Sequence, residues 1–274
     1  MRWRRLFIRT CLVCSMLVLA ACQAVETVIL QTATETPAGV ATNLPARSMP
    51  SEAEWQGIGE GLDWRLVIPD DNPLAQMVAV RVDPAYTRFR VHYEPGEPRT
   101  LRAWRDALPE AQVIINANFF SPEFTVLGLL VSDTVVYGQS YTDRGGTFAV
   151  ENGQVVMWSN LQRLYAGEAL EQAIQGFPML VLEGSAAYTD QRFTQRSRRT
   201  VIAEDAAGQI VILATPALGL SLPDLSAFLA QSGPNLLTAI NLDGGGSTML
   251  YLAPTGYFLP SLDAVPSVLA VYPR

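Results

Sequence analysis

The sequence of 274 residues contains no lysine and only one histidine. Without lysine, the chain cannot form a Schiff base with a carbonyl substrate or supply the lysine of a phosphate-binding P-loop. The single histidine, His92, lies in the strand-like stretch Phe89–Tyr93, where a half-buried structural position is expected rather than catalysis. A histidine-rich metal site is therefore excluded, and a Ser-His-Asp triad would have His92 as its one candidate.

Cysteine is scarce as well, and all three cysteines stand within the first 22 residues. Four arginines near the start precede an apolar run, Cys11–Ala21, which is too short to span a bilayer as a helix. The run ends in Leu19-Ala20-Ala21-Cys22, which resembles the lipobox of bacterial lipoproteins. We expect residues 1–22 to be a signal peptide ending at a lipidated Cys22, the alternative being an ordinary secretory signal with an incidental cysteine.

Removal of this signal would change the properties of the remaining chain. It carries four arginines and no acidic residue, so its loss takes the formal net charge from −7 to −11. An acidic domain is not expected to bind nucleic acid, because nucleic acid attracts basic surfaces. The acyl chains on Cys22 would attach the protein to a membrane of the cell envelope, facing outside the cytoplasm.

The mature chain divides by composition into a tether and a domain. Residues 23–54 are rich in Ala, Thr, Val and Pro without a clear period, which is typical of a flexible tether. Residues 55–274 then form a single domain without a thiol, so no disulfide, catalytic cysteine or cysteine metal site is expected in it. A chain of this length can bury enough apolar surface to be held by its core alone.

Short strands dominate the predicted secondary structure of this domain. Met77–Val82 and Arg88–Tyr93 are predicted to pair around Asp83-Pro84, and the turn Asn152-Gly153 predicts a hairpin within Gly146–Trp158. Further strands are predicted at Ala111–Asn116, Gly128–Val136, Met179–Leu182, Thr200–Glu204, Gln209–Ala214, Leu236–Leu242 and Met249–Leu252.

Three helices are predicted among these strands, at Thr100–Leu108, Leu161–Gln175 and Ser221–Gln231. The third is the clearest, because Ser221 and Asp224 form a capping box, an apolar stripe follows, and Gly233 stands at the expected C-cap. The predicted fold class is therefore α+β, with a mixed β-sheet core and a few packed helices in a single domain.

The most informative segment is Asn241–Met249, in which Asp243 is followed by three consecutive glycines, Ser247 and Thr248. Glycines are costly to order, so a run of them between two apolar strands suggests a sharp turn or a backbone that approaches a ligand closely. Successive amides in such a turn can bind an anion, and Asp243 can project into a cleft. A tight connection with Asp243 capping its own turn explains the segment equally well.

Two weaker segments accompany it. Asn116 and Asn118 follow a buried strand and precede two phenylalanines, a set suited to sugar hydroxyls and sugar rings but also to a polar strand end. Arg196, Arg198 and Arg199 lie within four residues, and arginine matches phosphate oxygens well. A solvated charged loop is the ordinary explanation for such a run.

Taken together, these segments resemble the phosphodiester glycosidase family. The family's elements stand here in the same order, although Asn-Ala-Asn replaces the common Asn-Gly-Gly, and the resemblance covers roughly residues 75–272. The matching segments are Asn116–Phe120, Pro178–Gly184, Arg199-Thr200, Ser221–Gln231 and Asn241–Ser247.

This resemblance implies hydrolysis of a sugar-1-phosphodiester in envelope or extracellular glycans, between the anomeric carbon and its oxygen. It implies catalytic roles for Asp243, as the carboxylate near the anomeric carbon, and for Asn116. Possible second carboxylates are Glu183, Asp205 and Glu123. Substrate-binding roles would fall to Asn118, Arg199, Asn241, Gly244, Gly245, Gly246, Ser247 and Thr248.

Two other classes of function are consistent with the same residues. A non-catalytic glycan-binding lipoprotein needs only the amides and aromatic rings. A metal-dependent phosphodiesterase would need a Ca²⁺ or Mg²⁺ ion held by oxygen ligands including Asp243, since cysteine and histidine are nearly absent.

Overall fold

Most strands of this protein are buried on both faces, which explains the long apolar runs in the sequence. The structure, a computed structural model, describes residues 54–69, 72–231 and 235–274. The expected signal peptide with Cys22 lies outside these residues, as do nearly all of the expected tether 23–54 and Gly233.

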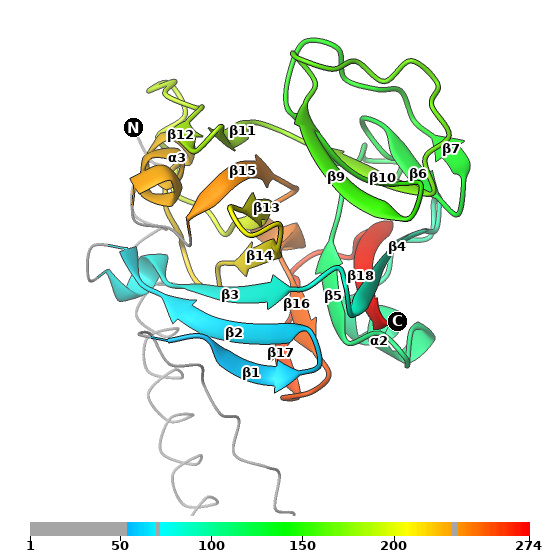
Figure 1. The fold of residues 1–274 in the computed structure, drawn as a ribbon, viewed down its shortest axis with the longest axis horizontal. Helices are drawn as coiled ribbons and strands as arrows, with labels where there is room; N and C mark the ends of the chain where they lie inside the picture. The colour runs from blue at the N-terminus through cyan, green and yellow to red at the C-terminus, as the bar shows by residue number, and fades with distance from the viewer. Residues whose placement is uncertain (1–53, 70–71, 232–234) are drawn as a thin grey trace, which may run out of the picture. The chain divides into compact units, whose positions relative to one another are not determined.

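The described strands form three sheets (Figure 1). The first sheet has the order β1 (Gln56–Gly59), β2 (Leu62–Val67), β3 (Met77–Val82), β14 (Ile210–Ala214), β13 (Thr200–Asp205), β15 (Leu236–Asn241), β11 (Met179–Leu182) and β12 (Ser185–Ala186). The second has β7 (Val135–Tyr137), β6 (Leu130–Ser132), β10 (Gln172–Gly176), β8 (Gly146–Glu151) and β9 (Gln154–Ser159). The third has β17 (Tyr257–Leu259), β16 (Leu250–Leu252), β5 (Val113–Asn116), β18 (Ser267–Pro273) and β4 (Thr87–Tyr93).

One hydrophobic core is shared by the inner faces of all three sheets. Val80 of the first sheet, Phe148 of the second and Ile115 of the third each contribute a fully buried side chain to it. Because side chains alternate along a strand, the neighbours of these residues point to the outer face of the sheet. They are buried only where another element packs on that face.

Each sheet has its own cover on the outer face. Helix α3 (Leu222–Gln231) packs beside β11 on the first sheet, and helix α2 (Leu101–Ala107) packs on the third through the buried ring of Trp104 (Figure 1). The second sheet is covered by the connection between β9 and β10, which buries Leu170 against Trp158.

Both of these helices begin as the sequence predicts. The amide of Asp224 donates to the Ser221 hydroxyl at 3.3 Å, and that hydroxyl donates to the Asp224 carboxylate at 2.6 Å. Thr100 caps α2 by accepting from the Ala103 amide at 3.4 Å. No helix among the described residues is long and apolar enough to cross a bilayer.

The predicted helix at Leu161–Gln175 is wrong. Residues 160–171 form turns and irregular structure, and Gln172–Gly176 is strand β10, paired with β8 and β6. The apolar residues of this segment do not share one face: Leu161 is 71% exposed, while Ala173 and Ile174 enter different cores on opposite sides of the sheet. Gly167, with φ +98°, also interrupts any helix here.

The predicted pairing of Met77–Val82 with Arg88–Tyr93 is also wrong, although both are strands. β3 pairs with β2 and β14, whereas β4 pairs with β18 in another sheet. The Asp83-Pro84 turn carries the chain from one sheet to the next, and alternation within a strand does not identify its neighbour.

The predicted fold class is confirmed in part. The described structure combines several sheets with a few helices, but it is predominantly β rather than clearly α+β, and every strand pairing in it is antiparallel rather than mixed. The hairpin β8–β9, with Asn152 and Gly153 at positive φ, confirms the predicted turn, and β13–β14 form a second hairpin.

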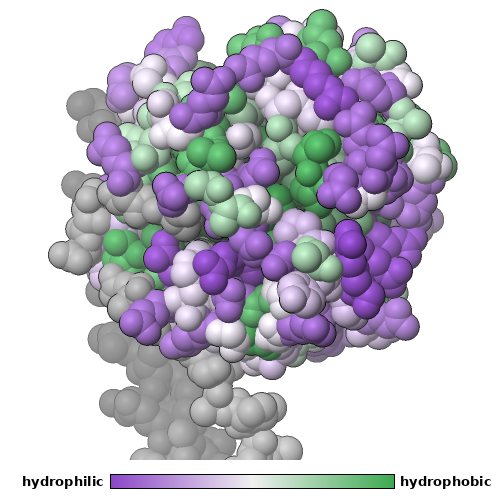
Figure 2. Space-filling view, in the orientation of Figure 1, coloured by the Kyte–Doolittle hydropathy of each residue, from purple (hydrophilic) through white to green (hydrophobic). Residues whose placement is uncertain are grey.

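The surface offers apolar residues only in small groups. On the face shown in Figure 2, hydrophilic residues are interspersed with apolar ones. The large exposed apolar side chains come from separate elements, such as Leu74, Val135, Leu161, Phe193 and Leu262. Exposed apolar residues of this kind are common on monomeric proteins.

Glycine permits the closest approach between the first and second sheets. Gly176 at the end of β10 stands opposite Gly146 of β8, and a Cβ on Gly176 would overlap the carbonyl oxygen of Asn241 in β15. The two strand ends can meet only because no side chain separates them.

We predict that Gly176→Ala lowers the free energy of unfolding by about 2 kcal/mol or more, because backbone atoms of β15 cannot move aside cheaply. Urea denaturation measures this change. Gly57→Ala is the control, since a Cβ there meets only the Asp63 carboxylate at 3.6 Å, and it should change stability by less than about 0.5 kcal/mol. Equal stability of the two variants would contradict the close approach of the sheets.

Candidate active site

Asp243 lies directly after the buried strand β15, at the start of the glycine turn that contains the 3₁₀ turn η3 (Gly245–Ser247). The Gly244 amide donates to its Oδ1 at 2.9 Å, and Ser247 also hydrogen-bonds the carboxylate. Burial raises the pKa of Asp243 above its ordinary value, and these two hydrogen bonds oppose the rise. The carboxylate is therefore oriented by the turn and poorly hydrated.

A second carboxylate, Asp263, belongs to the same site and is absent from the sequence prediction. The amides of Leu262 and Asp263 donate to the Gly246 carbonyl at 2.7 and 3.0 Å, and a Cβ on Gly246 would overlap the Asp263 carboxylate. The negative charge of Asp263 contributes further to raising the pKa of Asp243. Glycine at 246 thus lets the Asp263 carboxylate pack against the turn that begins at Asp243.

The three acidic residues suggested by the sequence serve elsewhere. Asp205 accepts from the amides of Ala207 and Gln209 and closes the β13–β14 turn. Glu183 occupies the β11–β12 turn with φ 52°, and Glu123 is exposed in the 121–125 turn. Each has the turn role that was the ordinary alternative.

The glycine turn is hydrogen-bonded to the segment that precedes β13. The Gly245 amide donates to the Arg198 carbonyl at 2.8 Å, and Gly245 has φ 60°, which favours glycine. With the Gly244 amide bound to Asp243, both of these amides are used within the protein. They do not form the open anion-binding nest that the sequence suggested.

Asn116 joins three segments at the end of β5. Its Nδ2 donates to the Asp243 carbonyl at 2.6 Å, and its Oδ1 accepts from the Thr200 hydroxyl at 2.7 Å and the Met249 amide at 3.2 Å. The side chain is 1% exposed. This geometry gives Asn116 a positioning role for the turn, and the catalytic role that the sequence suggested for it stays a prediction.

Three other predicted residues each have a buried side-chain oxygen that lacks a hydrogen-bond partner in the described structure. The Nδ2 of Asn118 donates to the carbonyls of Leu127 and Leu129, and that of Asn241 to the Phe177 carbonyl. The Oδ1 of both residues and the hydroxyl of Thr248 have no partner among the described residues. Such groups favour a hydroxyl-bearing ligand or water as partner.

Arg199 does not face the glycine turn. Its guanidinium donates to the carbonyls of Gln195 and Leu220, and Leu220 belongs to the outer core beneath α3. Arg198 donates to the Thr248 and Pro260 carbonyls at 2.7 and 2.9 Å, so it links the end of the glycine turn to the loop after β17. Adjacent residues of a strand-like segment point in opposite directions, and both guanidinium groups here donate to backbone carbonyls.

A loop that the sequence did not single out packs instead against Phe177, whose carbonyl accepts from Asn241 Nδ2, two residues before Asp243. Tyr141 lies close enough to Asp243 for the carboxylate to affect the phenol's pKa, which burial chiefly raises. Its ring meets that of Phe177 edge-on at 5.4 Å, and Phe177 lies 4.5 Å from Phe119. Arg144 stands 5.7 Å from the Phe177 ring. No spacing pattern links residues 141–144 with Phe177, so only the fold brings them together.

Metal ligands do not gather in this site. In the part of the chain that the structure describes, no group of three or more His, Cys, Asp or Glu side chains is arranged to hold a metal ion. The site instead combines two carboxylates, unpartnered amide oxygens and half-buried aromatic rings.

The sequence profile of the phosphodiester glycosidase family matches residues 109–272, which is more than half of the chain. This range contains every predicted site residue apart from Cys22, and also Tyr141, Arg144 and Asp263. No curated protein sequence matches the chain.

Solved structures share the fold at low sequence identity. The catalytic domain of zebrafish N-acetylglucosamine-1-phosphodiester alpha-N-acetylglucosaminidase, auto-inhibited by its pro-peptide, matches with a TM-score of 0.61 and 18% identity over 83% of this chain and 87% of that one. A hypothetical protein from Synechocystis gives 0.55 and 18% over 78% and 62%. A proposed exported protein of Burkholderia pseudomallei gives 0.57 and 13% over 77% and 74%.

We predict that Asn116→Ala lowers the free energy of unfolding by about 3 kcal/mol, because it leaves a buried carbonyl, hydroxyl and amide without their shared partner. Thr200→Val removes only one of the three hydrogen bonds and should cost about 1 kcal/mol. Chemical denaturation of both variants gives the comparison. An Asn116→Ala protein as stable as the wild type would show that this side chain does not hold the turn.

Proposed function

This chain belongs to the phosphodiester glycosidase family, and we propose from that premise that it hydrolyses the glycosidic bond of a sugar-1-phosphodiester in envelope or extracellular glycans. The observation that carries the proposal is that Asp263, from the loop after β17, packs against the glycine turn that holds Asp243. Most glycoside hydrolases use two carboxyl groups at one site.

The proposed reaction breaks the bond between the anomeric carbon and the phosphate oxygen. Water adds to the anomeric carbon and gives up one proton to Asp243 or to solvent, and the phosphate leaves as a monoester with the bond's electron pair. Such a leaving group needs little protonation, so the main requirement is negative charge near the developing oxocarbenium ion. Asp243, which the Gly244 amide and Ser247 hold in place, is the group proposed to activate water or stabilise that ion.

Sugar recognition is proposed for the groups around this carboxylate. The unpartnered Oδ1 atoms of Asn118 and Asn241 and the hydroxyl of Thr248 are suited to accept from or donate to sugar hydroxyls. The half-buried rings of Phe119 and Phe177 offer an apolar surface for a sugar face. Asn116 supports the site by holding the turn.

The cellular location is proposed from the N-terminal sequence. The lipobox-like Leu19–Cys22 supports export and attachment to an envelope membrane through a lipid on Cys22. One protein that shares the fold is itself described as a proposed exported protein.

We predict that Asp243→Asn lowers the turnover of a sugar-1-phosphodiester by about 10³-fold or more, because the amide cannot supply the negative charge. Release of free sugar from a panel of sugar-1-phosphodiesters by residues 55–274 measures the change. If wild type and variant release sugar equally, Asp243 is not the catalytic carboxylate. If neither turns over a substrate that both bind, the protein is a glycan-binding module.

Thermal unfolding provides the control for this variant. A folded-state pKa above the unfolded value means that stability is full at low pH and is lost as pH rises through the folded pKa. Because burial raises the pKa of Asp243, the charged carboxylate lowers stability at neutral pH. The melting temperature of Asp243→Asn at pH 7 should equal or exceed that of the wild type, so lost activity cannot be attributed to unfolding.

Lipidation is tested separately in a bacterial host supplied with a radiolabelled fatty acid. The full chain is expected to take up label and to sediment with membranes, whereas Cys22→Ser should do neither, because serine lacks the thiol that carries the lipid. Cys14→Ser is the matched control and should label as the wild type does. Labelling of Cys22→Ser would place the lipid elsewhere.

A further inference from the structure

The loop 139–145 contains Arg144, the cation that the described structure places beside the aromatic rings of the site. Phe177, against which this loop packs, accepts through its carbonyl from Asn241 Nδ2 at 2.8 Å, two residues before Asp243. Phe177 contacts Tyr141 edge-on and lies beneath the Arg144 guanidinium. Through Phe177, the loop thus lies next to the strand end that leads into Asp243, and it brings a positive charge and aromatic rings there.

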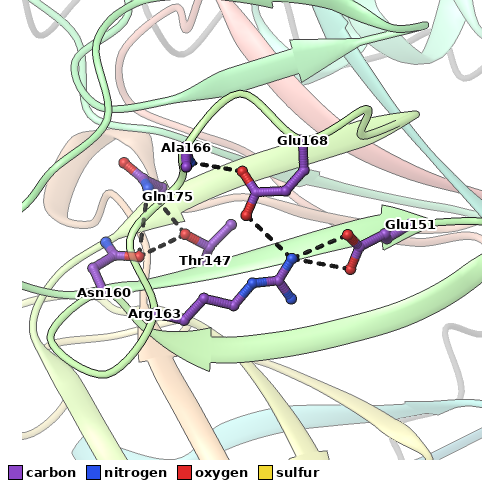
Figure 3. Close-up of polar contacts among 7 residues, drawn as sticks. All are labelled: Thr147, Glu151, Asn160, Arg163, Ala166, Glu168 and Gln175. Carbon is purple, nitrogen blue, oxygen red and sulfur yellow. Dashed lines mark hydrogen bonds and ion pairs between the residues drawn. The ribbon is translucent and has the colours of Figure 1, made fainter.

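Buried amide side chains of the second sheet fix this loop. Gln175, which is fully buried, accepts from the amide of Tyr141 at 2.9 Å and donates to the hydroxyls of Ser140 and Thr147, each at 2.9 Å. Asn160 donates to the Arg144 carbonyl at 3.0 Å and accepts from the Thr147 hydroxyl at 2.6 Å. Figure 3 shows Gln175, Thr147 and Asn160 converging on one another.

The segment after Asn160 is itself fastened to the sheet. Arg163 donates to Glu151 at 3.0 Å and to Glu168 at 3.2 Å, as Figure 3 shows, and its guanidinium lies 4.2 Å from the centre of the Trp158 ring. The backbone of Arg144 is thus placed by a chain of buried and half-buried contacts. A rigid support of this kind is what a binding group needs.

The side chain of Arg144, by contrast, remains available. It is 53% exposed, and its only ion pair among the described residues is with the adjacent Asp143, at 2.9 Å. An exposed pair between neighbours contributes little to stability, so an incoming anion can replace it at small cost. The guanidinium can then bind a phosphate through two parallel hydrogen bonds.

The other arginines near the glycine turn are committed elsewhere. Arg198 and Arg199 donate to backbone carbonyls, as described above. Arg196 lines a pocket of about 400 Å³ together with Asp224 and Phe228 of α3. The segment that the sequence singled out as a phosphate site therefore does not present its cations to the aromatic rings.

We propose that Arg144 binds the phosphate of the substrate while the sugar lies against the aromatic rings toward Asp243. This inference rests on the proposed function, because it assigns the phosphate end of the same substrate. It also makes the loop 139–145 the element that distinguishes a sugar-1-phosphodiester from an uncharged glycoside.

The test compares Arg144→Ala with Arg105→Ala, a closely matched control. Arg105 also pairs with its following neighbour, Asp106, and also lies 5.7 Å from a phenylalanine ring, that of Phe258 on the third sheet. KM and kcat are measured for the sugar-1-phosphodiester that the wild type cleaves best and for the uncharged nitrophenyl glycoside of the same sugar. Arg144→Ala should raise KM for the phosphodiester about 10- to 100-fold and leave the uncharged glycoside unchanged. Arg105→Ala should change neither.

A binding measurement separates this inference from the proposed function. The methyl phosphodiester of N-acetylglucosamine 1-phosphate is titrated calorimetrically into the Asp243→Asn protein, with and without Arg144→Ala. If the wild type cleaves phosphodiesters but Arg144→Ala keeps the wild-type KM, the Arg144 assignment is overturned and the function stands. If nothing is cleaved but Arg144→Ala weakens binding at least 10-fold, the function fails and the assignment stands. Absence of both cleavage and binding overturns both.

Discussion

The carboxamide of Asn116 is the interaction on which the site depends. One fully buried side chain binds the carbonyl of Asp243 after β15, the hydroxyl of Thr200 at the start of β13 and the amide of Met249 before β16. These segments belong to two different sheets. An amide can serve all of them because it donates and accepts at once, which no apolar or charged side chain of similar size can do.

The need for such a connection follows from the way the sheets are buried. Since the three sheets share one core and each has a cover on its outer face, most buried positions within the strands hold apolar side chains. The buried amide side chains lie at or near strand ends, where the backbone leaves the hydrogen-bonded ladder. Several strands end in the same region, so buried amides such as Asn116, Asn241 and Gln175 gather there and hydrogen-bond the loops.

Function and stability oppose each other at Asp243. Burial and the neighbouring Asp263 raise the pKa of this carboxyl, so its ionised form is destabilising, and the hydrogen bonds from Gly244 and Ser247 compensate only in part. Strain or unfavourable charge at one place is typical of sites selected for chemistry rather than for stability. The rigid surroundings, from the glycine turn to the loop on Gln175, hold the charge where water is scarce.

The sequence alone determined the family, the capped helix α3, the Asn152-Gly153 hairpin and the position of Asp243 at a strand end. These features depend on residues close together in the chain, and the spacing of such residues largely determines the local structure that they form. Other features needed the tertiary structure. Gln172–Gly176 is a strand because it pairs with β8 in the second sheet. β3 and β4 lie in different sheets because each pairs with a strand far along the chain, β3 with β14 and β4 with β18.

The functional site divides in the same way. The direction of Arg199, the position of Asn116 against the turn, the packing of Asp263 on Gly246 and that of Tyr141 and Arg144 on Phe177 depend on contacts between residues tens to more than a hundred positions apart. A sequence specifies which groups are present, but packing decides which of them meet, because each strand end can be placed only after every strand has found its neighbours.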